Sequence, residues 1–221
     1  MSTFVDTRPV SEFVQSSLCS PPGEVLEVGA GRGDLALRLI NTGYDVTAID
    51  PSGSNDGLVR PVALSEFNVS RGFDAVVASR TLHHIENLQA AINKLHRFTS
   101  VGGIVILHDF GWERVDVPTG RWLHSIIRQR SRRNSEAPLE ASFPDWFAQW
   151  RSEHAHLHRS TEMLDALREK FNERCYAECP YLAAEYVDVN PDLVEAEVSN
   201  IEDGAIKAAG FRFVGERLER V

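Results

Sequence analysis

The chain has 221 residues and a formal net charge of -9, and hydrophobic residues make up 43% of it. These values are typical of a soluble globular protein that can bury a core, with room for one α/β domain and an inserted cap. The negative charge disfavours a general nucleic-acid binder, because such a chain repels polyphosphate.

Cysteine content and hydropathy limit the location of the protein. Cys19, Cys175 and Cys179 are too few for the disulfide framework of a small secreted domain. Cys175 and Cys179 lack further ligands at a recognised spacing, so we expect reduced thiols and no metal site. The N-terminus lacks the basic and apolar regions of a signal peptide, and no apolar run approaches the roughly 18 residues of a membrane span. We therefore expect a cytoplasmic protein with no membrane partner.

Strand and helix patterns alternate through the first half of the chain. The helix expected at 34–41 has apolar residues at helical spacing in Ala36, Leu37 and Ile40, and Gly43 ends it. Repeated βα units imply a parallel sheet with helices on both faces. The expected strands are 24–28, 45–49, 61–64, 74–78 and 104–107, and a second helix is expected at 88–98.

The pattern changes after Gly111. Residues 112–171 lack strand alternation, and Phe143, Trp146, Phe147 and Trp150 fall at helical spacing. These aromatic residues fit either a hydrophobic core or a helical lid with an aromatic substrate pocket. We expect a sixth strand within 173–186, a helix at 191–209 and a last strand at 211–218.

These elements predict a Rossmann-like, doubly wound, mostly parallel seven-stranded sheet with an inserted helical cap. The predicted parts are an α/β core at 1–111, a helical cap at 112–171 that covers the binding site, and C-terminal strands and a helix at 172–221 that complete the sheet.

A glycine-rich loop follows the first strand. Gly29, Gly31 and Gly33 join that strand to the next helix, and a loop without Cβ atoms lets a bulky ligand lie against the backbone. A dinucleotide-binding loop has the pattern G-x-G-x-x-G, but its last glycine position is Asp34 here. A carboxylate would oppose a pyrophosphate, so the loop favours a cationic nucleoside without phosphates.

Four motifs then occur in order. Glu27-x-Gly29-x-Gly31-x-Gly33 resembles the first motif of class I S-adenosylmethionine-dependent methyltransferases, and Asp50 matches the acid that holds the ribose hydroxyls in that family. The stretch 79–85, SRTLHHI, resembles the motif after strand four in the small-molecule branch of the family. His108-Asp109-Phe110 follows strand five, where the family closes its active site. The resemblance covers about the first half of the chain.

The resemblance implies S-adenosylmethionine as the cofactor and a small molecule as the methyl acceptor. The family's usual acid after the third strand is absent, so we expect the adenine contact from the backbone of Leu64 and from Ser65. The residues that the resemblance assigns to the cofactor are Glu27, Gly29, Ala30, Gly31, Gly33, Asp50, Pro51, Leu64, Ser65, Ser79 and Arg80.

Two histidines and one aspartate are candidates for catalysis. His83 and His84 follow strand four and Asp109 follows strand five, so all three belong to the sheet edge where open α/β sheets bind ligands. A hydroxyl acceptor needs a base near its proton, and histidine has a suitable pKa. The alternative is that the histidine pair only shapes the loop.

Other basic groups are less informative. His154, His156 and His158 are spaced by two and are expected to be exposed to solvent. The run 128–133 fits a solvated face or mobile loop, or else recognition of an anionic group on the acceptor.

The sequence favours transfer of a methyl group to a hydroxyl oxygen of a secondary metabolite or sugar, with nitrogen or carbon acceptors next. The alternative is a non-transferring member of the same fold that keeps the cofactor, such as a cyclase, a lyase or a binding partner. The acceptor and the oligomeric state stay open.

Overall fold

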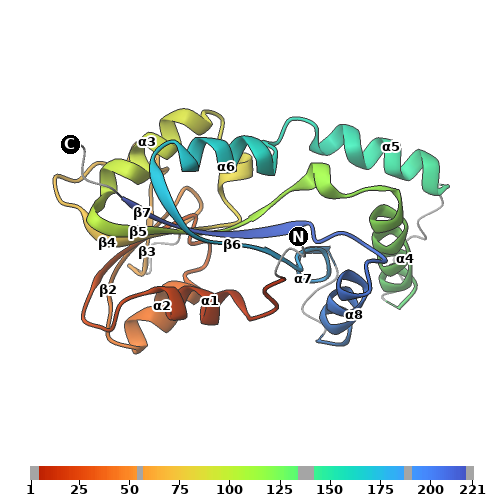
Figure 1. The fold of residues 1–221 in the computed structure, drawn as a ribbon, viewed down its shortest axis with the longest axis horizontal. Coiled ribbons are helices and arrows are strands. Elements are labelled where there is room, and N and C mark those ends of the chain that lie inside the picture. The colour runs from red at the N-terminus through yellow and green to blue at the C-terminus, as the bar shows by residue number, and fades with distance from the viewer. Residues whose placement is uncertain (1–4, 54–56, 134–141, 187–190, 218–221) are drawn as a thin grey trace. The chain divides into compact units, whose positions relative to one another are not determined.

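A seven-stranded sheet with the strand order β3-β2-β1-β4-β5-β7-β6 organises the chain (Figure 1). The computed structural model describes residues 5–53, 57–133, 142–186 and 191–217. The strands are β1 (Glu24–Val28), β2 (Asp45–Asp50), β3 (Val59–Pro61), β4 (Phe73–Ser79), β5 (Thr99–Phe110), β6 (Phe171–Cys179) and β7 (Gly210–Arg217). The α-helices are α1 (Val10–Ser17), α2 (Asp34–Asn41), α3 (Leu88–Phe98), α4 (Val117–Arg133), α5 (Phe143–His154), α6 (Ser160–Arg168), α7 (Leu182–Tyr186) and α8 (Pro191–Glu202).

The predicted fold class is confirmed. The neighbouring strands β1 and β2, β1 and β4, β2 and β3, and β4 and β5 all pair in parallel. From β1 the sheet continues to β2 on one side and to β4 on the other. This reversal of strand order makes the carboxyl end of β1 the topological switch point, where open α/β sheets bind their ligands.

The chain forms two compact units. The unit that we call the core unit comprises Arg8–Asp109, Thr161–Tyr176 and Arg212–Val221. The second, which we call the aromatic unit, comprises Met1–Thr7, Phe110–Ser160 and Ala177–Phe211. The predicted division into 1–111, 112–171 and 172–221 stays a prediction.

Both faces of the sheet in the core unit carry helices. Figure 1 shows α1 and α2 on one face and α3 and α6 on the other. The interior under α1 and α2 is built from aliphatic and aromatic residues of the helices and strands, whose removal from water is the main stabilising term. Buried members of this cluster include Phe13, Val25, Leu39, Val77 and Ile106.

Several boundaries and one helix face differ from the sequence predictions. Helix α2 has the predicted bounds, but Leu37 and Ile40 are 49% and 41% exposed, whereas Ala36 and Leu39 are buried. Apolar residues therefore occur on the solvent-facing side of α2 as well as on the side that packs against the sheet, and the spacing alone does not distinguish the two sides. Strand β3 ends at Pro61, before most of the predicted 61–64, because Val62 already turns back to bond the Arg60 carbonyl. Strand β5 extends beyond the predicted 104–107 in both directions.

The second half of the chain follows the predicted pattern with other limits. Residues 112–171 contain α4, α5 and α6, as the helical prediction expected. The sixth strand, β6, starts at Phe171 and gives way to the short helix α7 within the predicted range 173–186. Helix α8 stops at Glu202 instead of 209, because Gly204 adopts a positive φ of 70° that ends the helix.

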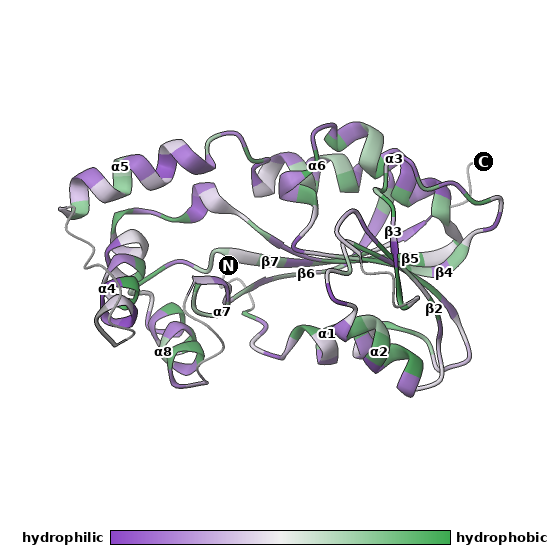
Figure 2. Ribbon diagram, turned by 180° about the vertical axis from the view of Figure 1, so that it is seen from behind, coloured by the Kyte–Doolittle hydropathy of each residue, from purple (hydrophilic) through white to green (hydrophobic). Residues whose placement is uncertain are grey.

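Aromatic side chains form the centre of the aromatic unit. Trp112, Trp146, Trp150 and Tyr181 are buried in one cluster with residues of α4 and α5. Figure 2 shows both hydrophobic and hydrophilic segments along α4, as expected of an amphipathic helix. Most of the aromatic residues at helical spacing therefore belong to a core. No helix within the described ranges is long and apolar enough to cross a membrane.

A buried carboxylate joins two helices of the aromatic unit. Glu197 of α8 is 1% exposed and accepts hydrogen bonds from the backbone amides of Tyr181, Leu182 and Ala183 at 2.8, 3.0 and 2.8 Å. Burial raises the pKa of Glu197, although the three amides act in the opposite direction. The carboxylate satisfies the donors that the start of α7 leaves unpaired.

We expect Glu197→Gln to destabilise the aromatic unit. The amide group of glutamine turns one acceptor into a donor, so at least one buried N–H loses its partner at a cost of about 1–3 kcal/mol. Glu195→Gln is the matched control, because Glu195 is exposed on the same helix. Urea denaturation of both variants measures the difference, and equal stabilities would contradict the assigned role of Glu197.

Candidate functional site

A cavity of about 530 Å³ lies in the core unit, next to the carboxyl ends of β1, β2 and β4. Its size is within the range of small-molecule sites in proteins. Seven residues singled out from the sequence line this cavity, so the fold brings them together. They are Gly29, Asp50, Pro51, Leu64, Ser65, Arg80 and His84.

The backbone geometry of the loop after β1 explains why it contains glycines. Gly29 and Gly31 have φ values of 73° and 55°, which L side chains rarely adopt. A Cβ on Gly29 would overlap the Thr81 hydroxyl oxygen, so the loop after β1 packs directly against the turn after β4. A Cβ on Gly31 would meet no protein atom within 4 Å, so the space beside this residue is open.

Asp50 at the end of β2 is tied to the glycine loop. Its Oδ2 accepts a hydrogen bond from the Gly31 amide at 2.9 Å, and its Oδ1 accepts bonds from the Ser52 amide and hydroxyl at 2.8 and 2.5 Å. Burial alone would raise the pKa of Asp50, but these bonds outweigh it, so the pKa lies below its ordinary value. The cavity therefore has a fixed negative charge at this end.

Glu27 lies beneath the loop instead of lining the cavity. It is 3% exposed, and its Oε2 is buried without a hydrogen-bond partner among the described residues. Burial raises its pKa to about 7, and the negative charges of Asp34 and Asp50 act in the same direction, while a bond from the Ala36 amide lowers it. A positive charge bound above the loop would favour the ionised form of this carboxyl group.

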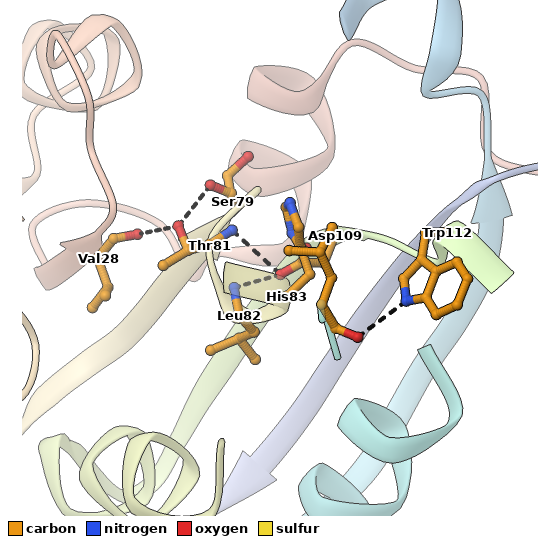
Figure 3. A network of polar contacts seen from close by, with 8 residues as sticks. Val28, Ser79, Thr81, Leu82, His83, Asp109 and Trp112 are labelled. Atoms are coloured by element: carbon orange, nitrogen blue, oxygen red, sulfur yellow. Dashed lines mark hydrogen bonds and ion pairs between the residues drawn. The ribbon is translucent and has the colours of Figure 1, made fainter. Parts of the chain in front are cut away.

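A buried carboxylate organises the turn after β4. Asp109, at the end of β5, is fully buried, and its Oδ2 accepts the amides of Leu82 at 2.8 Å and Thr81 at 3.4 Å. Its Oδ1 contacts Nδ1 of His83, which is itself 4% exposed. Figure 3 shows this network together with the bonds of the Thr81 hydroxyl to the carbonyls of Ser79 and Val28.

The two histidines have different surroundings. Oδ1 of Asp109 contacts Nδ1 of His83, and this contact favours the tautomer with the proton on Nδ1. His84 is exposed and lines the cavity, with its ring centroid 4.0 Å from that of His83. The two rings therefore differ in burial: His83 is buried beside the aspartate, and His84 borders the cavity.

Arg80, in the same turn, has strained backbone geometry. Its φ is 54°, in the left-handed region, where a side chain costs about 1–2 kcal/mol. Its amide donates to the His108 carbonyl at 2.7 Å, which anchors the turn to β5. Such strain often occurs at functional sites, because surrounding contacts must impose it.

The remaining sequence candidates are neighbours of the lining residues in the chain. They do not line it, but they belong to the loops and strand ends that do: Glu27, Ala30, Gly31, Gly33, Ser79, His83 and Asp109. Sequence reasoning missed Thr81, Asn87 and Lys94 as lining residues. Asn87 and Lys94 are seven apart, at the start and in the middle of α3, and this spacing is the signal that places them on one helix face.

The basic groups outside the core unit agree with expectation only in part. His154 and His158 are half-buried, whereas His156 is exposed as predicted. The His154 ring stacks on Trp150 with ring centroids 4.0 Å apart. The run 128–133 is the end of helix α4 and not a loop. Arg128 and Gln129 are exposed, as expected of a solvated face, whereas Arg130 donates to the Tyr186 carbonyl at 2.7 Å. The side chains at 132–133 lie outside the described residues.

No metal-binding cluster occurs in the described ranges. Within 5–53, 57–133, 142–186 and 191–217, no group of three or more His, Cys, Asp or Glu residues could hold a metal ion. None of the three described cysteines, Cys19, Cys175 and Cys179, takes part in a disulfide bond.

Comparison with known proteins identifies the family. Residues 6–176 match the model of a family described as a methyltransferase domain, so the chain belongs to that methyltransferase family. An uncharacterised methyltransferase of Staphylococcus carnosus is 32% identical over 112 residues, covering 44% of this chain and 52% of the relative. A ubiquinone biosynthesis O-methyltransferase of Rickettsia canadensis is 30% identical over 97 residues, covering 38% of this chain and 41% of the relative. The matched region thus spans about half, or less, of these relatives.

Solved structures share the fold at low sequence identity. The N-methyltransferase NodS of Bradyrhizobium japonicum, in complex with S-adenosylhomocysteine, has a TM-score of 0.56 at 13% identity, covering 95% of this chain and 85% of that chain. The [4+2]-cyclase SpnF has a TM-score of 0.60 at 15% identity, covering 96% and 80%. At these identities the likeness shows the fold alone.

We expect Gly29→Ala to destabilise the protein more than Gly31→Ala. Both substitutions place a side chain at a positive φ, at a cost of about 1–2 kcal/mol each. Only the first also forces a methyl group into Thr81, which adds an overpacking cost of about 1–3 kcal/mol. Chemical denaturation of the two variants without ligand tests this, and equal losses of stability would show that Thr81 moves aside freely.

Proposed function

We propose that the protein transfers a methyl group from S-adenosylmethionine to a hydroxyl oxygen of a small molecule such as a secondary metabolite or sugar. One observation carries the proposal: a single turn, residues 79–85, joins the cavity to a buried His83–Asp109 pair. Family membership supports the reaction class. The relative named for O-methylation supports the choice of oxygen.

The residues around the cavity fit this cofactor. When bound, S-adenosylmethionine supplies an activated methyl group on a positively charged sulfur. Asp50 provides carboxylate oxygens for the ribose hydroxyls, and its lowered pKa keeps it ionised at neutral pH. The open space at Gly31 accommodates a ligand against the backbone, and the ionisable Glu27 below the loop complements a cationic ligand. Leu64 and Ser65 are assigned to the adenine end.

The His83–Asp109 pair is suited to remove a proton from the acceptor. A hydroxyl is a weak nucleophile until a neighbouring group takes its proton. The contact of Asp109 with Nδ1 favours the His83 tautomer that carries its proton on Nδ1 and fixes the orientation of the ring. His84 is the alternative base, because it lines the cavity itself.

Two alternatives, transfer to an acceptor atom other than oxygen and a non-transferring role, can be distinguished from this proposal by experiment. One structural neighbour is an N-methyltransferase and another is a cyclase, so the fold accommodates more than one chemistry. Incubation with S-adenosylmethionine and panels of alcohols, phenols and amines distinguishes the possibilities. Formation of S-adenosylhomocysteine with alcohols or phenols supports the proposal, whereas formation with amines alone assigns nitrogen as the acceptor. Tight cofactor binding without turnover of any panel member would favour a non-transferring role.

The expected location is the cytoplasm, where small metabolites and the cofactor are both available. The expected partner is the small-molecule acceptor, with neither nucleic acid nor membrane involved. The net charge of -9 supports the exclusion of nucleic acid.

Replacement of Asp50 by alanine should weaken cofactor binding. Loss of hydrogen bonds to a charged group costs about 1.5–3 kcal/mol each, so the Kd for S-adenosylhomocysteine should rise at least about tenfold. Isothermal titration calorimetry measures the change. Asp45→Ala is a control, because Asp45 is exposed at the opposite end of the same strand. An unchanged Kd for Asp50→Ala would remove Asp50 from the ribose site.

Loss of the base should lower kcat with little effect on cofactor binding. General base catalysis contributes about 10²–10⁴-fold, so His83→Ala should lose activity in that range. Asp109→Asn should lose activity as well, because it no longer fixes the His83 tautomer. His156→Ala, an exposed histidine, should keep full activity.

Three other outcomes would revise the assignment. A large loss of kcat in His84→Ala with normal kcat in His83→Ala would move the base to His84. Full activity in all the variants would make both histidines structural. A collapse of S-adenosylhomocysteine binding in His83→Ala would assign His83 to the shaping of the cofactor site.

A further inference from the structure

The connection between β3 and β4 has an unusual construction. Parallel strands are usually joined by a helical crossover, but residues 62–72 contain no helix. These residues nevertheless form one wall of the cavity, through Val62, Ala63, Leu64 and Ser65. A wall made of turns needs support from elsewhere to hold its shape.

Helix α3 supplies that support through one side chain above all. The ammonium group of Lys94 donates hydrogen bonds to the carbonyl oxygens of Leu64, Ser65 and Phe67 at 2.9, 2.5 and 3.0 Å. An ammonium group has three donors, so this arrangement uses its full capacity. Lys94 also lines the cavity, which places these bonds at the cavity wall.

Two further contacts fasten the same connection to the same helix. Arg97 donates to the Asn68 side chain at 2.9 Å, and Phe98 packs edge-on against Phe67 with ring centroids 5.4 Å apart. Lys94, Arg97 and Phe98 lie three and four residues apart, so they share one face of α3. Lys94 alone reaches the residues that border the cavity.

We infer that Lys94 is a positioning residue for adenine recognition, because it fixes the peptide groups of Leu64–Phe67 at the cavity wall. The inference rests on the proposed placement of the cofactor, with its adenine next to Leu64 and Ser65. It assigns to α3 the support that a crossover helix would otherwise give to this wall.

The geometry of the peptide unit between Leu64 and Ser65 links Lys94 to a hydrogen-bond donor at the cavity wall. The Leu64 carbonyl and the Ser65 N–H belong to one planar trans peptide unit and point in opposite directions. When Lys94 holds the carbonyl, the direction of the N–H is fixed as well. Within the described residues the Ser65 N–H donates to no backbone carbonyl, so water or a ligand can accept a hydrogen bond from it. A fixed donor matches N1 of adenine, which accepts a hydrogen bond, and opposes N1 of hypoxanthine, which carries a proton.

The experiment compares two ligands that differ only in the base. The Kd values of S-adenosylhomocysteine and of its inosine analogue, S-inosylhomocysteine, are measured by calorimetry for wild type, Lys94→Met, Lys94→Arg and Arg97→Met. Methionine keeps an apolar stem at position 94 but removes the donors, whereas arginine restores donors. Arg97→Met is the matched control, since Arg97 binds the same connection away from the cavity.

The expected result is a loss of base selectivity. Lys94→Met should weaken S-adenosylhomocysteine about tenfold or more and the inosine analogue far less, so the preference for adenine shrinks. Lys94→Arg should recover part of the preference, and Arg97→Met should leave both Kd values unchanged. A melting curve without ligand shows whether each variant is folded.

Two results would overturn the inference. One is a Kd for S-adenosylhomocysteine in folded Lys94→Met within twofold of wild type. The other is an equal weakening of both ligands, which would make Lys94 a general support of the cavity without a part in base recognition. Asp50→Ala separates this inference from the proposed function: if Asp50→Ala weakens binding and Lys94→Met does not, only the role of Lys94 fails.

Discussion

The Asp109 carboxylate is the constraint on which the geometry of the site depends. A fully buried carboxyl group is costly unless it has hydrogen-bond partners, and here the Leu82 and Thr81 amides and the His83 ring are those partners. These bonds fix the turn after β4 relative to the end of β5. Since Thr81 in that turn packs against Gly29, the same carboxylate also determines where the glycine loop lies. Three neighbouring strand ends therefore share one electrostatic anchor.

Much of the fold could be predicted from the sequence, because local signals and long-range packing agree there. The helices at 34–41 and 88–98 have the predicted limits. Gly43 marks the end of the first helix in the sequence, and in the structure the Asn87 side chain caps the start of the second. Asp50 could be singled out because, at the end of the second predicted strand, it matches the ribose-binding acid of the family that the glycine motif resembles. The structure places it within hydrogen-bond distance of that loop.

The rest depends on tertiary contacts that a single sequence does not encode locally. Leu37 and Ile40 satisfy helical periodicity, yet the sheet covers the other face of α2. The alternation of His154, His156 and His158 predicts exposed side chains. In the structure His154 is half-buried, because its ring stacks on Trp150 and its Nε2 bonds the Tyr186 hydroxyl. Lys94 resembles an ordinary surface lysine on an amphipathic helix, and its three acceptors lie 27–30 residues away in the chain. Only the fold brings them together.

The contact between Lys94 and its acceptors has a consequence for sequence change. All three acceptors are backbone carbonyls, which every amino acid carries. The turn at 64–67 can therefore exchange its exposed side chains, at Ser65 and Glu66, without losing its attachment to α3. The lysine has no such freedom, because few side chains offer several donors at the end of a long stem. Substitutions are thus tolerated in the turn at 64–67 and restricted at Lys94. A design of altered nucleoside specificity would change the side chains of the turn and keep the lysine.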